Sequence, residues 1–194
     1  MRRAAVGLAT VLVLFAGAAP ASATLSEALS LEELVLESTH VVAVTALRET
    51  SRRDERQRIV SDVELRVDEV MKGPARVGQT LTVLRLGGAI GDLGMHVEGE
   101  ARFRPSARYL VFLRSLRDGR TLRPVGMSQG VMPIEAQGQG LMVLPGGGGL
   151  ALVQRAGGAL VPAPPALLHP EPLDAVRGRV GHVVAGEQRG SVAP

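Results

Sequence analysis

One serine in the sequence stands in a pattern that is typical of an enzyme nucleophile. Gly126-Met127-Ser128-Gln129-Gly130 matches the G-x-S-x-G turn of many serine hydrolases, in which a strained turn exposes the serine hydroxyl. Asp174 and His182 follow in the order serine, acid, histidine that those enzymes use. The pattern therefore raises the hypothesis of a secreted serine hydrolase with Ser128 as its nucleophile.

The residues after Ser128 argue against this hypothesis. A nucleophile elbow needs a strand before the serine and a helix after it, because the turn and the helix N-terminus supply the oxyanion donors. Here Val131-Met132-Pro133-Ile134 follows, and an apolar segment with a proline favours a strand over a helix. The chain also lacks the alternation of strands and helices of an α/β-hydrolase sheet. We therefore predict a glycine-bounded turn at Ser128 and no catalytic residue.

His96 and Glu98 are a second candidate for chemistry. Their side chains share one side of the chain if this segment is extended, and together they would make half of a metal site. Zinc sites use three or four protein ligands, and His40, His169 and His182 stand alone in the sequence. We therefore predict neither a metal nor a cofactor, and we interpret His96 and Glu98 as polar side chains of a loop.

These two side chains belong to a long segment, residues 87–107, of which the part after residue 88 shows neither a strand nor a helix period. Long ordered loops in compact domains are often functional. We therefore predict a binding surface here, and its candidate residues are Gly87, Gly88, His96, Glu98, Arg102 and Arg104.

The segments around this loop have the patterns of short strands. Val63, Leu65 and Val67 alternate with charged residues, which predicts a strand with one buried face. Residues 41–44 and 109–113 are apolar throughout, which predicts strands that are buried on both faces. The remaining strand candidates are residues 80–86, 122–125, 131–134, 141–144 and 150–153, and residues 48–58 are expected to form a charged hairpin loop.

Two helices are expected, one near each end of this set. Ser30-Leu31-Glu32-Glu33 is a capping box, which predicts a helix from Leu31 to about Ser38. Gly178 and Gly181 each cost the second helix about 1 kcal/mol relative to alanine, so we expect it to form only when docked, with a disordered tail after residue 186. The residues that recur at helical spacing in this helix are Leu173, Val176, Val180 and Val183.

Short strands with glycine-rich turns and few helices indicate a mainly β protein. An antiparallel sheet of such strands must curl or close to protect its edges. We therefore predict a small antiparallel OB-like barrel or curled sheet with a short N-terminal helix and a C-terminal helix. The expected division is a signal peptide (1–23), a β-barrel-like domain (24–155), a proline-rich linker (156–172) and a C-terminal helix with a flexible tail (173–194).

The first 23 residues have the pattern of a secretory signal peptide. Arg2 and Arg3 precede an uncharged run, and Ala21-Ser22-Ala23 supplies the small residues of a cleavage site. A helix that crosses a membrane needs about 20 apolar residues, and this run is shorter. We therefore expect a secreted or periplasmic protein with a Sec-type signal, cleaved near Ala23, and no stable insertion in a membrane afterwards.

The composition limits the class of partner. Without Arg2 and Arg3 the chain carries 20 basic and 19 acidic side chains, so its charge is two-signed rather than strongly basic. Only 2% of the residues are aromatic, which leaves no stacking platform for single-stranded nucleic acid. We therefore expect an exported protein as the partner and no nucleic acid. Because the chain has no cysteine, its stability must come from an aliphatic core.

Seven segments carry a resemblance to known domains: Ser38 to Val44, Val70 to Gly73, Leu86 to Gly88, Val97 to Gly99, Phe103, Tyr109 to Leu113, and Gln129-Gly130. They resemble a recurrent domain of exported bacterial proteins and, more distantly, the netrin-like and metalloproteinase-inhibitor OB-barrel family. The resemblance spans roughly residues 30–135 and implies a barrel. Inhibitors of that family chelate the zinc of a protease through an N-terminal cysteine. This chain has Thr24 at the expected mature N-terminus, so no functional residue is carried over.

The function that the sequence favours is an exported, non-catalytic, protein-binding module. Three alternatives stay open: the serine hydrolase at Ser128, an inhibitor of a secreted protease, and a structural envelope protein that docks through its proline-rich segment and C-terminal helix.

Overall fold

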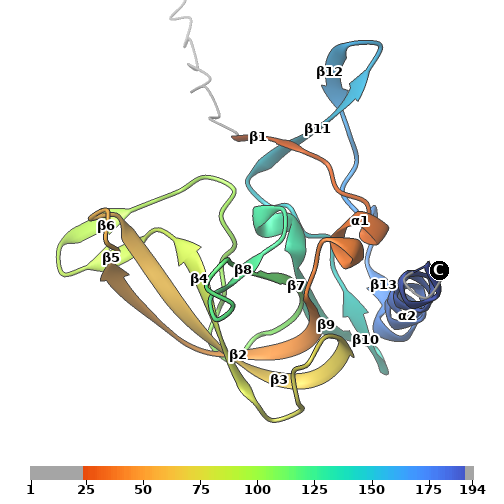
Figure 1. Ribbon diagram of the computed structural model, residues 1–194, viewed down its shortest axis with the longest axis horizontal. Helices are drawn as coiled ribbons and strands as arrows, with labels where there is room; N and C mark the ends of the chain where they lie inside the picture. The colour runs from red at the N-terminus through yellow and green to blue at the C-terminus, as the bar shows by residue number, and fades with distance from the viewer. Residues whose placement is uncertain (1–23, 191–194) are drawn as a thin grey trace, which may run out of the picture.

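Five strands close into a barrel in the structure, a computed structural model that describes residues 24–190. The strands, in order around the barrel, are β2 (His40–Arg53), β3 (Ile59–Lys72), β4 (Thr80–Leu86), β8 (Leu122–Pro124) and β7 (Arg108–Ser115), and β7 pairs with β2 again. All neighbours are antiparallel except β4 and β8, which run parallel. The predicted mainly β fold with a small barrel is confirmed (Figure 1). The predicted signal peptide lies outside the described residues.

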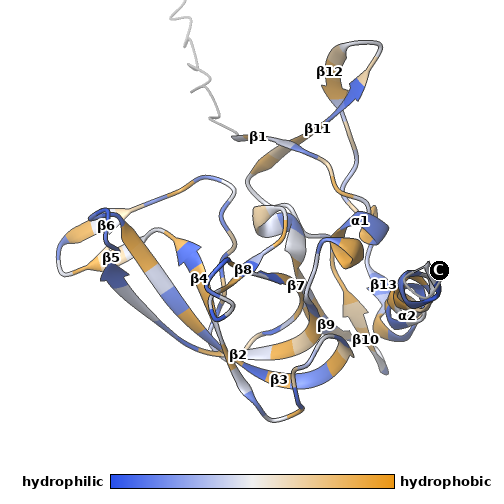
Figure 2. Cartoon of the chain, in the orientation of Figure 1, coloured by the Kyte–Doolittle hydropathy of each residue, from blue (hydrophilic) through white to orange (hydrophobic). Residues whose placement is uncertain are grey.

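The first part of strand β2, residues 40–44, is buried on both faces because it lies between two apolar cores. Val42 and Val44 point into the barrel, whereas Val41 and Ala43 point to the opposite side of the sheet. On β3, hydrophobic residues alternate with charged ones (Figure 2). Val63, Leu65 and Val67 belong to the core inside the barrel. The predictions from the continuous run at 41–44 and from the alternation at 63–67 are therefore both confirmed.

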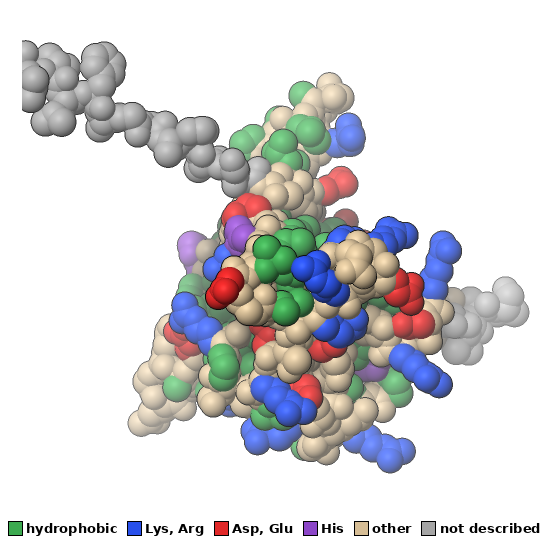
Figure 3. Space-filling model, turned by 90° about the vertical axis from the view of Figure 1, so that its left-hand side faces the viewer, with side chains coloured by type: hydrophobic (Ala, Val, Ile, Leu, Met, Phe, Trp, Pro, Cys, Tyr) green, Lys and Arg blue, Asp and Glu red, His purple; other side chains and the backbone are tan. Residues whose placement is uncertain are grey.

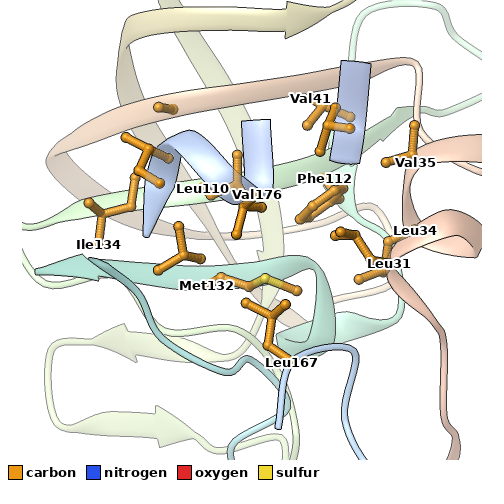
Figure 4. Packing of buried hydrophobic residues seen from close by; sticks show 14 of the residues in the cluster. Leu31, Leu34, Val35, Val41, Leu110, Phe112, Met132, Ile134, Leu167 and Val176 are labelled. Carbon is orange, nitrogen blue, oxygen red and sulfur yellow. The ribbon is translucent and has the colours of Figure 1, made fainter. Parts of the chain in front are cut away.

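The second core lies outside the barrel, under the two helices. Strands β9 (Val131–Gln137), β10 (Gly140–Val143) and β13 (Glu171–Pro172) extend the sheet beyond β7. Helices α1 (Leu31–Leu36) and α2 (Leu173–Gly190) cover this face, and Figure 4 shows Leu31, Phe112, Met132 and Val176 converging there.

Both helices begin and dock as their sequences indicated. The Ser30 side chain accepts the backbone N–H of Glu33, and the Glu33 carboxylate accepts the backbone N–H of Ser30, so the capping box is formed. On α2, Leu173, Val176 and Val180 are buried, whereas Cβ atoms at its glycines would meet open space. The helix continues to Gly190, beyond the expected end near residue 186, and in this last part Glu187 pairs with Lys72 of β3 at 2.8 Å.

The predicted hairpin loop at residues 48–58 is much shorter than expected. Strand β2 continues to Arg53 and β3 begins at Ile59, so residues 54–58 alone connect them. Arg48 pairs with Glu64 at 2.6 Å and Arg52 pairs with Asp62 at 2.6 Å across this hairpin. The charged side chains that suggested a loop form cross-strand ion pairs on an exposed ribbon instead.

A separate three-stranded sheet projects from the helical side of the barrel. It consists of β1 (Thr24–Glu27), β11 (Leu150–Ala156) and β12 (Ala159–Pro162), in the order β1, β11, β12. Gly157 and Gly158 both have positive φ, as a two-residue hairpin turn requires, and they join β11 to β12. Residues 156–172, expected as a linker, therefore contribute both β12 and β13.

Two small elements complete the described chain. A hairpin of β5 (Gly88–Ile90) and β6 (Leu93–Met95) extends from the end of β4, and a 3-10 helix, η1 (Met127–Gly130), precedes β9. Within residues 24–190, no helix combines the length and the hydropathy that a bilayer crossing requires.

Candidate functional site

A groove of about 930 Å³ runs along one side of the barrel, between two loops. One wall is the chain that follows β6, the other is the loop at residues 145–149, and β7 and β9 contribute its floor. Five of the six residues that the sequence singled out line this groove, namely Gly88, His96, Glu98, Arg102 and Arg104, whereas Gly87 lies just outside it. The long loop therefore supplies one wall of this groove.

The two glycines set the position of the β5–β6 hairpin. The carbonyl of Gly87 accepts the Ser61 hydroxyl at 2.7 Å. A Cβ at Gly88 would lie 2.3 Å from the Ser51 hydroxyl oxygen and 2.4 Å from that of Ser61, and Gly88 has φ +137°. Only a residue without a Cβ can lie this close to the two serines, so Gly87 and Gly88 allow the β5–β6 hairpin to pack on β2 and β3.

His96, Glu98 and Arg102 form a hydrogen-bonded chain at the rim of the groove. Nε2 of His96 lies 2.9 Å from Glu98 Oε2, and Nη2 of Arg102 lies 3.0 Å from His96 Nδ1. The same Arg102 nitrogen lies 3.3 Å from Nε2, so the guanidinium contacts both ring nitrogens. Among residues 24–190, no three His, Asp or Glu side chains gather as metal ligands, and His96 and Glu98 instead hold each other in place.

The two arginines are positioned by buried neighbours on an extended segment. Ala101 and Phe103 point into the barrel core, and Arg102 and Arg104 alternate with them toward solvent. The ring of Phe103 meets that of Tyr109 edge to face, with centroids 5.2 Å apart. The backbone N–H of Arg104 donates to the Tyr109 hydroxyl at 2.8 Å. The barrel interior therefore fixes the direction in which both guanidinium groups leave the surface.

The charges of the groove are unequally paired. Arg85 pairs with Glu49, and Arg108 lies 3.5 Å from Asp68. Within the described chain, neither Arg102 nor Arg104 has a carboxylate within 4.0 Å. The molecule's end face, at β5 and β6, has hydrophobic side chains at its centre and both basic and acidic ones around them (Figure 3).

The glycine-rich loop at residues 146–149 is the wall that the sequence did not point to. The backbone N–H of Gly147 donates to the Ser128 carbonyl at 2.9 Å. A Cβ at Gly146 would lie 2.6 Å from the Gln129 carbonyl oxygen, so this glycine allows the loop to lie flat on η1. The tertiary contact with η1 shows why this position needs a glycine.

Ser128 takes part in this packing. Its hydroxyl donates to the carbonyl of Gly148 at 3.0 Å, and β9 begins at Val131, so a strand follows the serine where an elbow needs a helix. Asp174 pairs with Arg177 on α2. His182 lies in a separate hollow between α1 and α2. The structure does not bring the three residues of the hydrolase pattern together.

Glu100 is a further polar residue that the sequence did not single out. It is buried, and its Oε1 accepts the backbone N–H of Leu86 at 3.1 Å and lies 3.6 Å from Arg123. Its Oε2 has no hydrogen-bond partner within the described part of the chain. Glu100 thus fastens the end of β4 to the segment that carries Arg102 and Arg104.

Comparisons with known proteins add no relative: no protein-family model matches the chain, and no curated protein matches it either.

Proposed function

We propose that the chain is an exported, non-catalytic binding module whose groove receives a segment of a partner protein. The observation that carries this proposal is the groove itself, which gathers the loop residues 96–104 opposite a wall of glycines. Its volume of about 930 Å³ lies in the range of protein ligand sites, and it is lined by apolar, basic and acidic residues together. A two-signed rim of this kind suits a protein surface better than a polyphosphate.

The walls of the groove support binding because they are already held in place. The chain of His96, Glu98 and Arg102 fixes one rim, and the Phe103–Tyr109 contact fixes the segment beneath it. A preformed site loses little conformational entropy when a partner is bound. The Ser128 hydroxyl, which faces the same groove, is engaged by the Gly148 carbonyl rather than by an imidazole.

The absence of cysteine makes a direct test practical. A single cysteine at Glu135, an exposed residue of the groove, can carry a benzophenone maleimide as the only labelled site of the chain. The matched control is a cysteine at Arg120, which is exposed in the turn after β7. Both labelled proteins are irradiated with the exported fraction of the source cells. We expect a discrete crosslinked protein from the Glu135→Cys variant alone, whereas no crosslink, or the same products from both positions, contradicts the proposal.

A further inference from the structure

We propose that the groove recognises an acidic segment in extended conformation, through Arg102 and Arg104. This inference rests on the proposed function, because it specifies the chemistry of the partner segment.

The groove is lined by four arginines and three glutamates, and two of the arginines favour acidic groups in the partner. Of its four arginines, Arg85 and Arg108 each face a carboxylate of this chain, whereas Arg102 and Arg104 do not. The Nη2 atom of Arg102 lies 3.0 Å from Nδ1 and 3.3 Å from Nε2 of His96, and this contact brings no carboxylate to the guanidinium. Guanidinium groups bind carboxylates by two parallel N–H···O bonds, which fixes the position and orientation of an acidic side chain.

The spacing of the two arginines favours an extended partner. They alternate with the buried residues Ala101 and Phe103, so both side chains leave the same side of an extended segment. In such a segment, residues i and i+2 lie about 7 Å apart. An extended partner chain with acidic residues at i and i+2 has the same spacing, so each carboxylate can meet one guanidinium.

The opposite wall leaves room for the backbone of such a partner. A Cβ built on Gly148 meets no atom within 4 Å, so the middle of the glycine loop borders open space. At Gly148 another main chain can approach closely, because no side chain stands there. At Gly149 the added Cβ would lie 2.8 Å from Glu98 Oε1, so the two walls meet at that end of the loop.

The test is a selection of random peptides displayed on phage against the purified full chain. The same selection is run on Arg102→Glu/Arg104→Glu and on the matched control Arg117→Glu/Arg120→Glu. Arg117 and Arg120 are exposed in the turn at the far end of β7, roughly 23 Å along that strand from the groove, and their replacement changes the net charge equally.

We expect the wild type and the control to enrich peptides with Asp or Glu at alternate positions, and the charge-reversed variant to enrich Lys or Arg there. A selected acidic peptide, measured by fluorescence anisotropy, should bind Arg102→Ala/Arg104→Ala about tenfold more weakly than the wild type, and Arg117→Ala/Arg120→Ala as tightly as the wild type. Circular dichroism of each variant verifies that it is folded.

Three results overturn the inference. They are peptides without an acidic preference, the same peptides on the charge-reversed variant, and no enriched peptide at all. Peptides that crosslink to the groove without an acidic preference refute the recognition rule while the proposed function stands. If, in addition, the cysteine at Glu135 crosslinks to no exported protein, the proposed function fails as well.

Discussion

Two glycines of the same loop should respond in opposite ways to alanine. At Gly146 the added Cβ would lie 2.6 Å from the Gln129 carbonyl oxygen, 2.9 Å from that of Ser128 and 3.1 Å from that of Val131. All three are backbone atoms, so the loop itself must shift. At Gly148 the added Cβ meets nothing within 4 Å.

The magnitudes follow from these contacts. Forcing an extra methyl into a packed site costs about 1–3 kcal/mol, so Gly146→Ala should lower the free energy of unfolding by that amount. Gly148→Ala should raise it by about 0.4–1 kcal/mol, because alanine restricts the unfolded chain. In a domain of this size each kcal/mol corresponds to about 2–4 °C in Tm.

Urea unfolding followed by circular dichroism measures both variants against the wild type. Because Gly146 shapes the groove wall, Gly146→Ala should also weaken the crosslink from a cysteine at Glu135. The Cβ of Gly148→Ala would enter the space left for the partner's backbone, so this variant should weaken the crosslink without a loss of stability. Equal unfolding free energies for the two variants would refute the view that the loop lies tightly on η1.

Three further predictions follow from single contacts. Gln129→Ala should destabilise the protein by about 1–3 kcal/mol in urea unfolding. The buried Gln129 amide accepts the backbone N–H of Leu29 at 2.9 Å and donates to the Glu27 carbonyl at 3.0 Å, and both bonds are lost. A change within error would count against a stabilising role of these two bonds. Glu100→Ala should cost about 1–3 kcal/mol, because the N–H of Leu86 loses its acceptor, and a neutral result in the same assay would contradict that role. Burial lowers the pKa of His40, so on acidification the unfolded state takes up the proton before the folded state does. The free energy of unfolding should therefore fall as the pH drops below about 6.5 and level off below the folded-state pKa. An unchanged pH slope in His40→Asn would disprove the assignment.

The fold could be predicted where hydrophobic period and local capping decide the structure. The alternation at 63–67 and the continuous run at 109–113 correctly indicated one-sided and two-sided burial, because side-chain period follows directly from strand geometry. The capping box at Ser30 and Glu33 fixed the start of α1 for the same local reason.

What could not be predicted depends on contacts between distant segments. The ribbon of β2 and β3 extends through residues 48–53 because Arg48 and Arg52 meet acids on the other strand, and charge alone does not distinguish a paired strand from a loop. Likewise, the glycines at 146–149 are a groove wall only because η1, from a different part of the sequence, lies beneath them.

The candidate loop residues had a partial signal in the sequence. The missing period of the segment after residue 88 indicated a loop, and five of the six chosen residues line one groove. Arg85 and Glu135 were not found, because each belongs to a strand whose place beside the groove appears only in the folded chain. The buried Glu100 was not found either, because its contact with Leu86 is tertiary.

The most direct measurement is a backbone amide map by nuclear magnetic resonance, with the ¹⁵N-labelled protein titrated with the partner identified by crosslinking. Binding in the groove predicts shift changes concentrated at residues 96–109 and 145–149, with the α1–α2 surface and the β11–β12 hairpin unaffected. Changes centred on the helices or on that hairpin, with an unperturbed groove, would contradict the account.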